Sequence, residues 1–94
     1  MNTEKVKVVE TIHTTVQERV ESLGEGLRIT GDVTVQNGTV TAIDSITVTD
    51  PDSGILLWSG CANPALSGSF YQEGREIEVM MAIMEFINAI KSNN

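Results

Sequence analysis

The strongest constraint on the fold is a run of alternating apolar and polar residues between positions 27 and 60. Its first part places an apolar residue at every second position, which is the period of a strand with one buried face. Asn37 and Gly38 follow directly, and both residue types tolerate the positive φ angles of a two-residue hairpin turn. The sequence therefore predicts a β-hairpin centred on Asn37-Gly38.

The remainder of this run predicts two more strands. The apolar phase changes over residues 43–45, which indicates a β-bulge that re-aims the side chain of Asp44. Residues 50–54 contain Pro51, Gly54 and two aspartates, the composition of a turn. Residues 55–58 are all apolar, as expected for a strand covered on both faces. We therefore predict a three-stranded antiparallel meander.

The segment before the meander, residues 3–23, has two possible interpretations. Val6-Lys7-Val8 alternates like a strand. Over the whole segment, however, apolar residues step by three and four positions, which predicts a helix that ends at Gly24. The residues with this spacing are Val9, Ile12, Val16, Val20 and Leu23. We expect the helix.

The last segment, residues 73–92, predicts a helix with two neighbouring apolar stripes. One stripe comprises Ile77, Met80, Met81, Met84 and Ile87, and the other comprises Val79, Ile83, Phe86 and Ile90. Together they span an arc of about 220°, which is wider than one sheet face can cover. The arc either lies between the sheet and the first helix, or its second stripe is a protein interface.

These elements predict one α+β domain over residues 1–94: helix, three-stranded antiparallel meander, helix, with both helices on one face of the sheet and the threonines outside. The order resembles the topology of double-stranded RNA-binding domains. Those domains have a basic cluster at the start of the second helix, whereas residues 72–76 contain one arginine and two glutamates. RNA binding is therefore not predicted.

Charge and cysteine content exclude several classes of function. The net charge is −7, and there is no Lys or Arg between Ile29 and Gly74, so direct binding to nucleic acid is not expected. The single cysteine, Cys61, excludes an internal disulfide and a multi-cysteine zinc site. The chain has no apolar run of about 20 residues that would span a membrane. We expect a cytoplasmic protein without metal or cofactor.

Catalytic candidates are few. Residues 61–69 are rich in Gly, Ser, Ala and Pro and predict a loop that begins at Cys61. No Lys or Arg is near in sequence to activate this thiol, and the one histidine, His13, is distant along the chain. Asp44 beside the bulge is the other candidate, because its position breaks the strand pattern. No catalytic residue is predicted, and we do not expect an enzyme.

The sequence thus predicts a small acidic protein-interaction module that forms a homodimer through its C-terminal helix, with Val79, Ile83, Phe86 and Ile90 as the interface. The identity of any other protein partner stays open. The alternative is an inhibitor of the kind encoded by phages or mobile elements, which mimics nucleic acid and blocks a nuclease in restriction or CRISPR systems. Its acidic face would comprise Glu10, Glu18, Glu21, Glu78 and Glu85.

Overall fold

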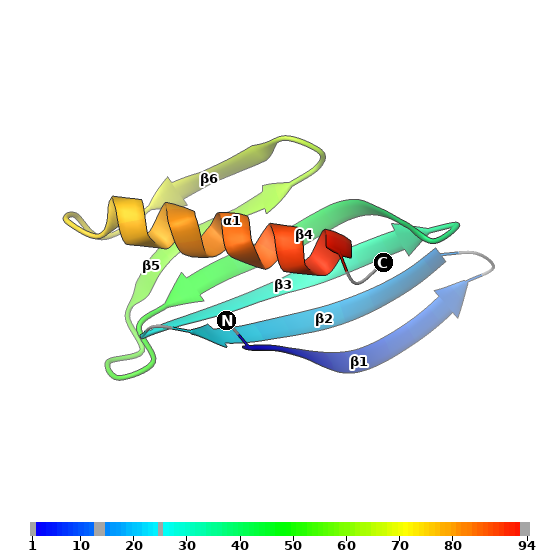
Figure 1. Ribbon diagram of the computed structural model, residues 1–94, viewed down its shortest axis with the longest axis horizontal. Helices are drawn as coiled ribbons and strands as arrows, with labels where there is room; N and C mark the ends of the chain where they lie inside the picture. The colour runs from blue at the N-terminus through cyan, green and yellow to red at the C-terminus, as the bar shows by residue number, and fades with distance from the viewer. Residues whose placement is uncertain (1, 13–14, 25, 93–94) are drawn as a thin grey trace.

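The described part of the chain forms one antiparallel sheet of six strands, and a C-terminal helix crosses one face of it (Figure 1). The computed structural model describes residues 2–12, 15–24 and 26–92, with the side chains of residues 17–22 and 26–92. Each strand pairs with the next one along the chain. The elements are β1 (Asn2–Ile12), β2 (Thr15–Gly24), β3 (Leu27–Gln36), β4 (Thr39–Thr49), β5 (Leu56–Ala62), β6 (Leu66–Phe70) and α1 (Glu76–Ser92).

The helix predicted for residues 3–23 is wrong, because this segment forms β1 and β2, which pair antiparallel. A spacing of four residues is also a multiple of the two-residue strand period. Val16 and Val20 accordingly pair with Val35 and Gly31, which are both on one face of β3. The segment is also rich in Val, Thr and Ile, whose branched Cβ atoms favour strands. The predicted order with two helices on one face is therefore wrong as well.

The predicted sheet of three strands is also wrong, because the sheet has six, and the predicted meander forms only β3, β4 and β5 within it. Asn37 and Gly38 form the hairpin turn with φ angles of 52° and 79°. The predicted bulge is also present, because the β4–β5 register shifts beside Ser45, whose φ is 50°. Residues 50–54 form the second turn, in which the Gly54 amide donates to the Asp50 carbonyl over 2.7 Å.

The loop predicted for residues 61–69 is wrong, because β5 continues to Ala62 and β6 begins at Leu66. Gly68, within the predicted loop, and Gly60, just before it, instead make room for an indole ring. A Cβ atom added to Gly68 would lie 2.1 Å from Trp58 Cζ2, and one added to Gly60 would lie 2.6 Å from Trp58 Cη2. Glycine within a strand often marks such a close approach, so Gly60 and Gly68 belong to paired strands.

The core lies between α1 and the central strands. On β3 the apolar side chains of Leu27, Ile29, Val33 and Val35 are buried, while the even-numbered residues between them are partly or fully exposed. α1 packs mainly on β3 and β4. Phe86 lies over Gly31, where an added Cβ would come within 3.2 Å of its ring. One helix therefore covers the sheet face that was predicted to pack against two helices.

Candidate functional site

The face of the sheet opposite α1 is open and polar. The Thr30 and Thr47 hydroxyls are 2.6 Å apart across β3 and β4, and the Ser59 and Tyr71 hydroxyls are 2.8 Å apart. Thr47 and Ser59 are register partners on β4 and β5, so these groups form one row of hydroxyls across the sheet. These hydroxyl groups can donate hydrogen bonds to a ligand or to water and accept hydrogen bonds from either.

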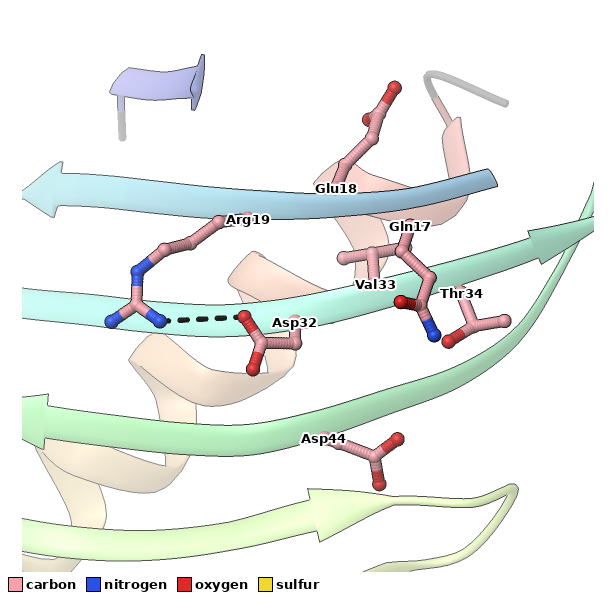
Figure 2. A pocket seen from close by; sticks show the side chains of 7 residues that line it. All are labelled: Gln17, Glu18, Arg19, Asp32, Val33, Thr34 and Asp44. Atoms are coloured by element: carbon pink, nitrogen blue, oxygen red, sulfur yellow. Dashed lines mark hydrogen bonds and ion pairs between the residues drawn. The ribbon is translucent and has the colours of Figure 1, made fainter. Parts of the chain in front are cut away.

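Beside this row is a shallow hollow of about 400 Å³, shown from close by in Figure 2. Arg19 on β2 and Asp32 on β3 point toward each other, with Arg19 Nη1 and Asp32 Oδ1 3.4 Å apart. Both side chains are about half exposed, so this ion pair contributes about 1 kcal/mol or less. The complete lining is Gln17, Glu18, Arg19, Asp32, Val33, Thr34 and Asp44.

Asp44, the catalytic candidate from the sequence, is part of this lining. It pairs in register with Asp32, so two carboxylates of neighbouring strands lie on the open face. Asn63 Nδ2, from the turn between β5 and β6, donates a hydrogen bond to Asp44 Oδ1. The bulge therefore places Asp44 on the polar face, where an amide satisfies one carboxylate oxygen.

The lining of the hollow is mostly polar and charged. Its described lining contains two aspartates, one glutamate, one guanidinium group, one side-chain amide, one hydroxyl and one valine. Cys61 is a free, half-buried thiol on β5, and His13 lies outside the described residues. Within the described residues no three metal-binding side chains come together.

A charged cluster joins the start of α1 to the turn between β4 and β5, and the sequence analysis did not find it. Arg75 Nη1 donates to Asp50 Oδ2 over 3.0 Å, and Arg75 Nε donates to Glu78. The Asp52 amide bonds to Asp50 and lowers the pKa of that carboxyl, and Arg75 lowers it further. The hydrogen bond to Glu78, and then that to Asp50, raises the pKa of Arg75. These ion pairs therefore connect the start of α1 to the turn between β4 and β5.

The structure buries all of one apolar stripe of α1 and divides the other: Ile87 is in the core and Met80 packs against it, whereas the remaining three residues are exposed. Val79, Ile83, Phe86 and Ile90, the residues predicted as the interface, are at most 1% exposed and belong to the core. In contrast, Ile77, Met81 and Met84 are 79%, 62% and 47% exposed. These three are spaced by four and three residues, so they form one stripe that faces away from the sheet. We call them the outward stripe.

The sequence contained a weak indication of which apolar stripe of α1 is buried. Three of the four residues that were predicted as the interface and are buried are β-branched, and the fourth is Phe86; such rigid side chains fill a core efficiently. Methionine is flexible and is common at adaptable binding surfaces. Side-chain rigidity therefore favoured burial of the stripe that contains Phe86 and exposure of the methionines.

The predicted acidic residues do not lie on one face. Glu21 is on the open face of the sheet, where its carboxylate lies 3.1 Å from Arg28 Nε. Glu78 and Glu85 are exposed on α1, which covers the opposite face. Glu18 pairs in register with the inward-facing Val33, whereas the side chain of Glu10 lies outside the described residues. Two of the five carboxylates, Glu21 and Glu78, also pair with arginine.

The chain matches no protein-family model, no curated protein and no solved structure. Among the described residues, no helix has the length and the apolar content needed to cross a bilayer. Function is therefore inferred from the geometry of the described residues alone.

Proposed function

We propose that the protein is a small, non-enzymatic, cytoplasmic protein-interaction module whose contact surface is the outward stripe of α1. The observation that supports this is the exposure of Ile77, Met81 and Met84 on a helix whose other apolar stripe is fully used by the core. Contiguous apolar side chains that a monomer leaves in water are typical of protein contact sites.

The surroundings of the outward stripe favour a protein partner. A shallow hollow of about 480 Å³ lies beside Ile77 and Met81, bounded by Gly74, Arg75 and Glu78. Apolar side chains next to a charged rim are the usual composition of a protein interface. Methionine can also adjust its shape to a partner surface. In the simplest form of this proposal the partner is a second copy, and two outward stripes pack together.

The experiment compares Met81→Glu with Gln36→Glu. Both positions are exposed and both variants add one negative charge, but only the first one interrupts the outward stripe, because Gln36 lies at the end of β3. Light scattering after size exclusion should give wild-type and Gln36→Glu masses above 10.2 kDa at high concentration. Met81→Glu should give a lower mass than both at the same concentration, with an unchanged melting temperature.

If the wild type stays at 10.2 kDa at every concentration, self-association through α1 is excluded. A photo-crosslinking residue at position 84 then tests for another protein in cells. A crosslinked protein that is lost with Met81→Glu and kept with Gln36→Glu supports the module. If neither variant changes the crosslinks, the outward stripe is not its contact surface.

The alternative function, mimicry of nucleic acid, requires a cluster of unpaired carboxylates. The placements of Glu21 and Glu78, on different faces and each beside an arginine, give this alternative no specific support. The interaction module is therefore the function that we propose.

A further inference from the structure

The second surface that lacks a partner is the outer edge of β6. Of the described strands, none pairs with this edge, and Figure 1 shows β6 at the rim of the sheet. The Tyr71 amide donates to the Leu57 carbonyl over 2.9 Å, so Tyr71 points its backbone groups toward β5. Backbone direction alternates along a strand. Leu66, Gly68 and Phe70 therefore point their N–H and C=O groups away from β5, toward the free edge.

β6 also lacks the features that usually prevent edge pairing. Edge strands are commonly protected by charged side chains, prolines or bulges. Residues 53–72 contain no Asp, Glu, Lys or Arg, and β6 pairs with β5 without a register shift. At the opposite edge, β1 contains Glu4, Lys5, Lys7 and Glu10 and has a register shift between Val6 and Glu10. Only the β1 edge is protected in this way.

We propose that the β6 edge pairs with β6 of a second copy, antiparallel, about a two-fold axis through Gly68. This register places Leu66 opposite Phe70 of the second copy and Gly68 opposite itself. All three residues have outward-directed backbone groups, as an antiparallel hydrogen-bonded pair requires. The edge is therefore complementary to itself, and a two-fold contact of this kind closes after two copies.

The side chains also match in this register. Gly68 lies under the Trp58 ring, so its neighbours Leu66 and Phe70 face the α1 side. Leu66 already packs against the core, and Phe70 is 41% exposed. Phe70 would cover Leu66 of the second copy, which buries apolar surface on both subunits. Ser67 and Ser69 would meet on the open polar face, and no like charges would oppose each other.

This contact is separate from the outward stripe and does not depend on the proposed function. A two-fold axis perpendicular to the sheet leaves both α1 helices on the same face of the joined sheet. The outward stripes of both copies therefore stay accessible, and different variants test the two surfaces.

The test uses Ser67 and Ser69, which are exposed and point away from the core. In the proposed register Ser67 lies directly opposite Ser69 of the second copy. Replacing both residues with lysine places like charges opposite each other twice. The matched control, Ser67→Lys with Ser69→Glu, places opposite charges there. Light scattering and sedimentation equilibrium from micromolar to millimolar concentration measure the dimer, and circular dichroism checks the fold.

We expect the wild type to approach twice 10.2 kDa. The double-lysine variant should raise the dissociation constant about tenfold or more, because like charges directly opposite each other destabilise a strand pair. The Lys/Glu control should dimerise at least as well as the wild type. A wild type that remains at 10.2 kDa throughout overturns the proposal. So does equal dimerisation of the two variants, or a dimer that only Met81→Glu disrupts, which would instead place the contact on α1.

Discussion

The two faces of the sheet are built from the same strands but are stabilised in different ways. On the covered face, Ile29 and Val33 of β3 are at most 1% exposed under α1. On the open face, Thr30 and Asp32 of the same strand are in contact with Thr47 and Arg19. Burial of a large apolar side chain contributes about 1.5–3 kcal/mol, whereas a cross-strand polar pair contributes about 0.2–1 kcal/mol. The free energy of unfolding should therefore depend mainly on the covered face.

The largest expected effect is that of Phe86→Ala on the covered face. Phe86 is completely buried, and truncation of a buried aromatic ring costs about 3–5 kcal/mol because it leaves a cavity. Urea unfolding followed by circular dichroism measures the loss. As a control, Thr34→Ala on the open face should change stability by less than about 0.5 kcal/mol. Equal losses for the two variants would contradict the difference between the faces.

The second prediction concerns the space between Gly31 and α1. A Cβ atom added at Gly31 would lie 3.1 Å from Ile43 Cγ2 and 3.2 Å from the Phe86 ring, so Gly31→Ala should cost about 1–3 kcal/mol by overpacking. In a Phe86→Leu background the same change should cost clearly less, because the ring atoms are gone. If the cost is identical in both backgrounds, contact with Phe86 is not its cause.

The third prediction is that a substitution on the covered face increases the free energy of unfolding. Ser22 is 1% exposed, and its hydroxyl has no hydrogen-bond partner among the described groups. Ser22→Ala removes this unpaired polar atom and should raise the free energy of unfolding by about 1 kcal/mol. Ser69→Ala, at an exposed position, should leave it unchanged. A loss of stability with Ser22→Ala would show that the hydroxyl has a partner.

The sequence predicted the features that depend on local interactions and failed for those that depend on contacts between distant parts of the chain. The hairpin at Asn37-Gly38 and the bulge at Ser45 depend on local backbone preferences, and both were predicted correctly. The identity of residues 3–23 depends on pairing between β2 and β3. The apolar spacing of this segment is compatible with a helix and with a strand, so that long-range pairing decided between them.

The parts of the candidate sites that could not be predicted are also those set by distant contacts. Gly60 and Gly68 resemble loop residues until the Trp58 ring is placed over them. The approach of Arg75 to Asp50 joins residues 25 positions apart, which no local pattern indicates. The apolar arc of α1 was recognised in the sequence, but only the position of the sheet determines which stripe faces outward.

The smallest expected effect is the pH dependence due to Asp50, which links the turn beside the sheet to the start of α1. Its pKa is lowered below the ordinary value of 3.8, first by the Asp52 amide and then by Arg75. Because the folded state favours the ionised carboxylate, this contribution to stability is fully present above pH 3.8. It is lost as the pH falls through the lower pKa of the folded state. Asp50→Asn should therefore lower the melting temperature slightly at neutral pH, and the difference from the wild type should shrink below pH 3.8. Asp52→Asn is the matched control, since it removes a carboxylate from the same turn without breaking the bond to Arg75. A difference between wild type and Asp50→Asn that is constant with pH would show that the carboxylate charge does not help to hold α1 to the sheet.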